Sequence, residues 1–277
     1  MDTTRLHRAV SADGTQIVGS VHGQGPPIAL VPGGPADGES GWLSLLPHLT
    51  DHFTCFPINT RGRALSADHP DHSRERLVED IVALIESIGD AVTLFGHSAG
   101  GTHALEAAAH TSAVRDLVLY EPTLMELASD ARLTRFADAF ARVRRATEGG
   151  RPADGAWIFL EELAMANDRE LTLLAEANAA QEMAPLVPVV LAEEAQSGLP
   201  QLSDLSLLER VTMPVLLLHG ARTDPFYTSV VKYLAERLAD GRVREIPEVG
   251  HLGPEVAPGP VAAELVGLLE ATAPEPG

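Results

Sequence analysis

Short apolar runs rich in β-branched residues alternate with longer amphipathic stretches in two parts of the chain, and this alternation most restricts its fold. The apolar runs are 27–31, 54–58, 91–95, 117–120, 215–218 and 243–246. Such alternation predicts an α/β domain with a mostly parallel central sheet flanked by helices. Residues 8–21, with Asp13-Gly14 at their middle, predict a hairpin ahead of the sheet. Residues 42–49 predict a helix.

The alternation breaks down between residues 123 and 210. Four helix-like stretches follow one another there with no strand between them, near 125–148, 152–166, 168–183 and 185–196. We interpret this insertion as a helical cap over a site at the edge of the sheet. The alternative is a separate helical domain that takes no part in the chemistry. We therefore assign residues 1–122 and 211–277 to the core domain and 123–210 to the cap domain.

The charge balance bears on which partners the chain can have. Its 277 residues hold 39 acidic and 20 basic side chains, a formal net charge of −19. Phosphate backbones and anionic membrane surfaces need Lys and Arg to neutralise them, so neither nucleic acid nor a membrane is expected as a partner. The N-terminus has no apolar signal segment, and no apolar run approaches the ~20 residues that span a bilayer. We expect a cytoplasmic protein and leave open whether it is a monomer or a homodimer.

The passage from residue 91 to residue 110 carries the clearest chemical signal. Gly96-His97-Ser98-Ala99-Gly100 matches the pattern G-x-S-x-G and lies between an apolar strand and an alanine-rich helix. In such a turn the nucleophile occupies strained backbone, and the flanking glycines avoid steric clashes. Ser98 is therefore the candidate nucleophile. A serine hydroxyl is a poor nucleophile at neutral pH and needs an adjacent base.

His251 is the leading candidate for that base. It follows the last apolar run, in the loop that precedes a predicted helix over 258–271. Catalytic groups gather in loops at the carboxyl edge of a parallel sheet. Three other histidines near the expected site, His97, His103 and His219, are interpreted as structural, and His97 is expected to point away from Ser98.

Together these residues resemble the α/β-hydrolase superfamily over nearly the whole chain. The matching pieces, in chain order, are Leu30–Gly34, Asn59–Arg63, Gly96–Gly101, Tyr120–Pro122, His219-Gly220 and Gly250-His251. The elbow and the paired glycines after Val31-Pro32 are similar to the zearalenone-type lactonase branch. The resemblance implies an α/β-hydrolase fold with a helical cap after the sixth strand. It also implies an oxyanion hole built from the backbone N–H groups of Ala99 and Gly34, with Gly33 as the alternative to Gly34.

The acid of a catalytic triad is the point where the chain departs from the commonest pattern of the superfamily. That pattern places an Asp three residues past a Gly after the seventh strand, but Thr223 holds this position and Asp224 comes one residue late. Glu121 lies at the end of the sixth strand, where haloalkane dehalogenases and zearalenone-type lactonases have their acid. A carboxylate at either strand end could orient His251. We favour Glu121 and keep Asp224 as the alternative.

These features predict a serine hydrolase that cleaves a carboxylic ester or lactone through an acyl-serine intermediate. The alternatives are a non-hydrolytic enzyme on the same fold, such as a lyase, a cyclase or a cofactor-free oxygenase, and a ligand-binding, receptor-like protein. No residues stand at metal-ligand spacing and no phosphate-binding glycine motif is present, so we expect neither a metal nor a cofactor. The apolar side chains of the cap suggest a mostly apolar small-molecule substrate.

Overall fold

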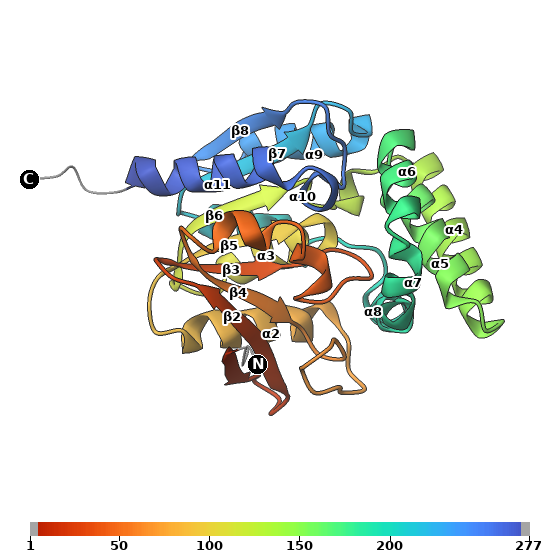
Figure 1. Cartoon of the computed structure of the whole chain (residues 1–277), viewed down its shortest axis with the longest axis horizontal. Coiled ribbons are helices and arrows are strands. Elements are labelled where there is room, and N and C mark those ends of the chain that lie inside the picture. The colour runs from red at the N-terminus through yellow and green to blue at the C-terminus, as the bar shows by residue number, and fades with distance from the viewer. Residues whose placement is uncertain (1–4, 273–277) are drawn as a thin grey trace, which may run out of the picture.

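The computed structural model of the protein describes residues 5–272 and shows a mostly parallel sheet of eight strands (Figure 1). The strands lie in the order β1-β2-β4-β3-β5-β6-β7-β8. β1 pairs antiparallel with β2, and β2 with β4, whereas β3 to β8 all run parallel. The bounds are β1 (Arg5–Val10), β2 (Gln16–Gly23), β3 (Pro27–Val31), β4 (Thr54–Asn59), β5 (Val92–His97), β6 (Val114–Tyr120), β7 (Val215–Gly220) and β8 (Gly241–Ile246). The predicted hairpin corresponds to β1 and β2.

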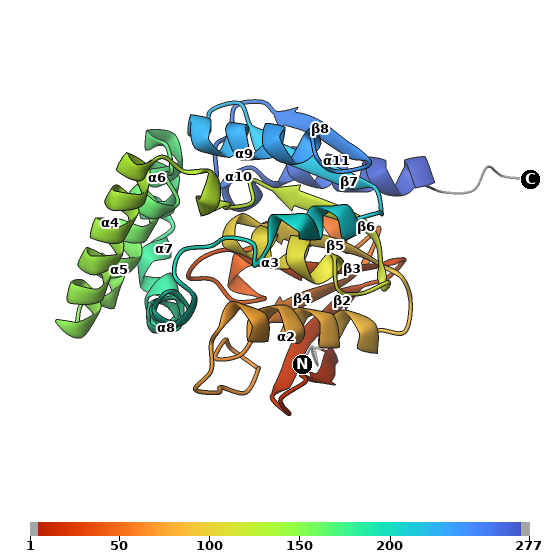
Figure 2. The same ribbon diagram turned by 180° about the vertical axis from the view of Figure 1, so that it is seen from behind.

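The central strands are continuous apolar runs because helices cover both faces of the sheet. Every residue of β3, β5 and β7 is buried. In β3, Ala29 and Val31 join the apolar cluster on one face, while Ile28 and Leu30 join the cluster on the other. Figure 2 shows α2, α3 and α9 in front of the sheet, and Figure 1 shows α11 in front of its opposite face. The bounds are α1 (Leu46–Leu49), α2 (Arg74–Ser87), α3 (Ser98–Ala108), α9 (Pro225–Ala235), α10 (Gly253–Val256) and α11 (Pro258–Thr272).

The segment between β6 and β7 is helical and forms a block at one side of the sheet in both views (Figures 1 and 2). Its main helices are α4 (Asp130–Glu148), α5 (Pro152–Ile158), α6 (Asp168–Glu176), α7 (Ala179–Met183) and α8 (Val187–Ser197). The structure interrupts three of the predicted helical stretches. In the first, extended backbone at Ala128 separates a 3₁₀ turn over Met125–Leu127 from α4. A π-helical turn over Phe159–Leu163 follows α5, and Asn178 is left-handed (φ 57°), which ends the right-handed path of α6. No helix among residues 5–272 is long and apolar enough to cross a membrane.

The single helix predicted over residues 42–49 is wrong. The structure has a short 3₁₀ turn at Ser40–Trp42 and a separate short helix, α1. Pro47 lies in the first turn of α1, where its missing N–H is not needed, and it could not sit inside a longer helix without breaking the hydrogen-bond ladder. Trp42 and Leu49 are nevertheless both fully buried, because the two pieces pack on the same face of the sheet.

Candidate active site

Ser98 is the first residue of α3 and directly follows β5. Its backbone is left-handed (φ 56°), a strained conformation for a residue with a side chain. The surrounding glycines are required by close packing: a Cβ on Gly96 would lie 2.7 Å from the Ala104 Cβ, and one on Gly100 would lie 2.1 Å from the Pro32 carbonyl oxygen. The G-x-S-x-G pattern therefore reflects a turn that only these residue types can form.

The His251 side chain lies between Ser98 and Glu121. Its Nε2 is 2.9 Å from the Ser98 Oγ, and its Nδ1 is 2.8 Å from the Glu121 Oε2. The imidazole is 1% exposed, so water does not compete for either contact. In this arrangement the serine hydroxyl donates to Nε2, while the Nδ1–H donates to the carboxylate. The geometry is that of a nucleophile, a base and an orienting acid.

Glu121 follows β6 directly and has a left-handed backbone (φ 45°). Its carboxylate is fully buried and accepts two further hydrogen bonds. The Gly220 backbone N–H donates to Oε1 (2.8 Å), and the Thr223 hydroxyl donates to Oε2 (2.7 Å). Thr223, which stands where the superfamily most often has its Asp, is thus a hydrogen-bond donor to the acid.

Asp224 points elsewhere. Its carboxylate caps the N-terminus of α9 by accepting the Phe226 N–H (2.8 Å), and its Oδ1 lies 2.7 Å from the Arg132 guanidinium on α4. Both contacts are structural roles: the first stabilises the N-terminus of α9, and the second is an ion pair with α4. Of the two candidate acids, the structure brings Glu121 to His251 and uses Asp224 to join α9 to the cap.

Burial sets the protonation of the pair formed by His251 and Glu121. Burial, together with the nearby His97, holds the pKa of His251 well below its ordinary value, so its imidazole is neutral and can accept a proton. Burial also raises the pKa of Glu121 to about 7, against the lowering effect of its hydrogen bonds from Gly220 and Thr223. Activation of a serine by this pair would require a neutral His251 and an ionised Glu121.

This protonation predicts an acidic limb in the pH profile. Because Glu121 works ionised and its pKa is about 7, activity should be present above that pH and fall as the pair takes up a proton below it. In Glu121→Gln only His251 titrates, so the limb should move to lower pH. The measurement is kcat/KM against pH for both proteins. An acidic limb at the same pH in both would contradict this assignment.

The candidate oxyanion hole lies beside the nucleophile. The Ala99 N–H belongs to the first turn of α3, where backbone donors have no partner within the helix. Gly33 and Gly34 follow β3 and line the same small cavity as Ser98, and a Cβ on Gly33 would lie only 3.0 Å from the Ser98 Cβ. The two glycines therefore allow backbone N–H groups to approach an oxygen bound at the nucleophile.

The model of the alpha/beta hydrolase family matches residues 28–264. The chain belongs to the alpha/beta hydrolase family. The predicted α/β-hydrolase fold is confirmed by this match and by the strand order. The likeness to the zearalenone-type lactonase branch stays a prediction.

Solved structures resemble this family member over nearly the full length of both chains. An alpha/beta hydrolase from Sphaerobacter thermophilus is 26% identical with a TM-score of 0.77, covering 95% of this chain and 100% of that one. A thermophilic esterase from Thermogutta terrifontis is 22% identical with a TM-score of 0.78, covering 96% and 98%. A bromoperoxidase from Bacillus anthracis is 20% identical with a TM-score of 0.73, covering 96% and 99%. Among curated proteins, no sequence matches the chain.

Glu170 connects the helical segment between β6 and β7 to the loop that carries His251. It lies on α6, is 2% exposed, and its Oε1 accepts the backbone N–H groups of Gly250 (2.9 Å) and Leu252 (3.0 Å). Its Oε2 accepts the N–H of Asn167, the residue that caps α6. One carboxylate from the cap thus holds the residues on both sides of His251. The Asn167-x-x-Glu170 spacing is that of a capping box, but the contact with the His251 loop left no signal in the sequence, because Gly250 and Leu252 are 80 or more residues away.

Glu170→Gln should loosen this loop. An amide has one acceptor oxygen in place of two, so at least one of the three N–H groups loses its partner, at a cost of about 1–3 kcal/mol in the free energy of unfolding. We expect kcat to fall roughly tenfold with KM little changed, because the alignment of the base suffers. Steady-state kinetics and thermal denaturation measure both effects. Glu176→Gln, an exposed change on the same helix, is the matched control. Equal kinetics in the two variants would argue against this role.

Three other buried side chains contact His251 or the loop that carries it. The Tyr227 ring stacks on the His251 imidazole (3.9 Å between centroids, 9° between planes). The Tyr120 hydroxyl donates to the Gly250 carbonyl (2.6 Å). His97 supports the same loop, since its Nε2 lies 2.9 Å from the His251 carbonyl oxygen and its ring 4.9 Å from the His251 ring. The turn at Ser98 aims the residue before it toward the same loop.

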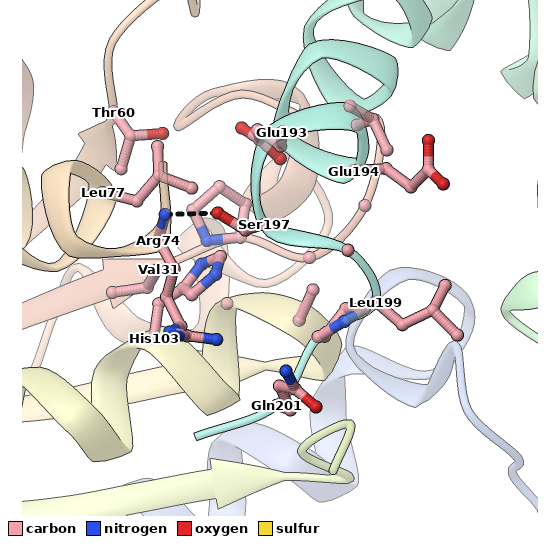
Figure 3. Close-up of a pocket in the computed structure, with 18 of the residues that line it drawn as sticks. Val31, Thr60, Arg74, Leu77, His103, Glu193, Glu194, Ser197, Leu199 and Gln201 are labelled. Atoms are coloured by element: carbon pink, nitrogen blue, oxygen red, sulfur yellow. Dashed lines mark hydrogen bonds between the residues drawn. The ribbon is translucent and has the colours of Figure 1, made fainter. Parts of the chain in front are cut away.

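A larger recess adjoins the catalytic cavity. It has a volume of about 70 Å³ and lies between α8 and the core. Figure 3 shows it, with the Arg74 backbone N–H donating to the Ser197 hydroxyl (2.7 Å). Gly34 and Ala99 line it, and the Phe159 ring separates it from Ser98, because Phe159 lines both spaces and packs against Gly34. His103 also lines the recess, and burial lowers its pKa.

Within the described residues, no group of three or more His, Cys, Asp or Glu side chains is placed to hold a metal ion. His219 is the next-to-last residue of β7, and its Nδ1 contacts the Gly220 carbonyl (3.2 Å).

Proposed function

We propose that this member of the family hydrolyses carboxylic esters or lactones through an acyl-serine intermediate. Ser98 is the nucleophile, His251 the general base and acid, and Glu121 the residue that orients the imidazole and stabilises its charged form. The backbone N–H groups of Ala99 and Gly34 stabilise the oxyanion. Of the two acids weighed from the sequence, the proposal takes Glu121.

The observation that carries the proposal is the continuous hydrogen-bond chain Ser98–His251–Glu121, buried and joined by contacts of 2.9 and 2.8 Å. The fold alone does not select the chemistry, because similar structures include esterases and a bromoperoxidase. Binding alone does not require a buried neutral imidazole against a strained serine, whereas activation of a serine nucleophile does. This arrangement therefore supports a covalent mechanism.

The residues account for each step of the reaction. The Ser98 Oγ attacks the carbonyl carbon while His251 takes the hydroxyl proton, and the negative charge moves to the carbonyl oxygen in the oxyanion hole. Collapse of the tetrahedral intermediate breaks the ester bond, and His251 returns the proton to the leaving alcohol. Water then attacks the acyl-serine by the same sequence, releasing the acid. For a lactone, the alcohol and the acid belong to one product.

The walls of the catalytic cavity favour an apolar substrate. Phe159, Leu160, Ala164, Met183 and Leu252 line the space around Ser98 and His251. Apolar linings with few polar groups are typical of small-molecule sites.

A panel of p-nitrophenyl esters and lactones tests the proposal with the purified protein. We expect turnover of at least one ester or lactone and, after rapid quenching, a mass increase equal to the acyl group on the peptide that contains Ser98. Neither turnover nor an acyl adduct with any member would favour the non-hydrolytic alternatives, a lyase, a cyclase or a cofactor-free oxygenase. Binding of panel members without any chemistry would favour the receptor-like alternative.

A further inference from the structure

Glu255 is a charged side chain at the catalytic cavity that the proposed mechanism does not use. It lies on α10, close after His251 in the chain, and lines the same cavity as Ser98 and His251. Its side chain is 18% exposed. The rest of this wall is largely apolar, so a carboxylate here requires an explanation.

One oxygen of Glu255 is paired with His97. Because the His97 Nε2 faces the His251 carbonyl, which can only accept, this nitrogen carries a hydrogen. The Nδ1 lies 3.2 Å from the Glu255 Oε1. Burial alone would lower the pKa of His97, but Glu255 and the His251 carbonyl outweigh it and raise the pKa above its ordinary value. The two side chains form an imidazolium–carboxylate pair.

The other oxygen of Glu255 is left without a donor. The Oε2 is shielded from solvent and has no hydrogen-bond partner among the residues that the structure describes. A buried acceptor without a partner is costly, and native proteins rarely keep one. A donor on a ligand in the catalytic cavity would satisfy it.

Glu255 also lines a surface groove next to the catalytic cavity. This groove, between the loop after β3 and helices α6 and α7, shares Ala36, Met183 and Glu255 with the catalytic cavity. Two leucines in this groove are unusually exposed for their type, Leu43 at 68% and Leu173 at 37%. The groove suits an apolar arm, and Glu255 stands between it and Ser98.

We propose that the Oε2 of Glu255 accepts a hydrogen bond from a hydroxyl group of the substrate, so that the preferred substrates are hydroxylated apolar esters or lactones. The inference rests on the proposed function and names its substrate class. A neutral hydroxyl fits better than an ammonium group, because His97 already balances the charge of Glu255. The apolar wall also offers a cation no interaction that would offset the cost of its desolvation.

Matched ester pairs that exchange a hydroxyl for a methyl group test the inference. On the acyl side the pair is p-nitrophenyl 3-hydroxybutyrate and p-nitrophenyl 3-methylbutyrate, and on the alcohol side 2-hydroxyethyl butyrate and propyl butyrate. In the wild-type protein we expect kcat/KM to favour the hydroxylated member of at least one pair by about tenfold or more. Glu255→Leu should abolish this preference. Glu182→Leu, which removes a carboxylate that lines only the outer groove, should retain it.

Binding separates this inference from the proposed function. In Ser98→Ala protein, calorimetry should give a tighter Kd for the same hydroxylated ester, and the added Glu255→Leu change should remove the difference, whether or not the wild type turns esters over. If Glu255 served only to hold His97, Glu255→Leu would slow both members of a pair equally. An unchanged ratio in that variant, or equal binding and equal rates for both members in the wild type, would overturn the inference.

Discussion

Ser98→Ala should lower the rate of ester hydrolysis by about four orders of magnitude or more, which is the scale on which removal of a serine nucleophile acts in triad enzymes. The loss is this large because the Oγ is the atom that forms the acyl bond. It lies 2.9 Å from the His251 Nε2 in a turn that holds it in strained backbone. Labelling by a fluorophosphonate probe should disappear together with the activity.

The fold should survive this substitution. Ser98 is small and alanine fills most of its volume, so the thermal unfolding temperature should change little and could rise if the backbone strain at φ 56° eases. Ser197→Ala, at a hydroxyl in the neighbouring recess, is the matched control and should keep both activity and labelling. Labelling that persists in Ser98→Ala would show that another serine is the nucleophile.

Glu121→Gln should lower kcat by roughly two to four orders of magnitude, as neutralising a triad acid does. Glutamine keeps the shape but loses the charge that stabilises the imidazolium, and its amide can face the His251 Nδ1 with a donor. Asp224→Asn should cost under about tenfold, because asparagine still caps a helix and the ion pair with Arg132 is partly exposed. Steady-state kinetics of the two variants, each with a thermal unfolding curve, decide between the two acids.

Thr223→Val tests the assignment of Glu121 as the triad acid by changing one of its hydrogen-bond partners. Valine matches threonine in shape but removes the hydroxyl that donates to Glu121 (2.7 Å). The pKa of Glu121 should then rise further, because one of the hydrogen bonds that lower it is gone. The acidic limb of the pH profile should move to higher pH.

In the comparison of the two candidate acids, a larger loss in Asp224→Asn than in Glu121→Gln would transfer the role of the acid to Asp224.

Local sequence determined the elements that depend on nearby residues. The alternation of apolar runs and amphipathic stretches predicted the parallel sheet, and the family match and strand order confirm the fold. The G-x-S-x-G turn could be recognised because its clashes involve neighbouring segments such as Ala104 and Pro32, which leave glycine as the residue that fits. The helix predicted over residues 42–49 failed, since Pro47 starts a new helix there.

Only the tertiary structure decided how distant strand ends meet. The choice between Glu121 and Asp224 depends on side-chain directions at the ends of β6 and β7, which lie beside each other in the sheet but about a hundred residues apart in the chain. Spacing favoured Glu121 only weakly, whereas the structure points Glu121 at His251 and turns Asp224 toward Arg132.

The roles of Glu170 and Glu255 could not be predicted from sequence patterns, because they too depend on contacts between distant parts of the chain. In the sequence, Glu170 and Glu255 resemble ordinary acidic residues of helices. Their proposed roles follow from their positions against the loop and the cavity around His251. The contact of His97 with the ring and the carbonyl of His251 likewise joins residues that are far apart in the chain. A sequence encodes local backbone preferences directly, but the partners of a buried polar group are fixed only when distant segments pack together.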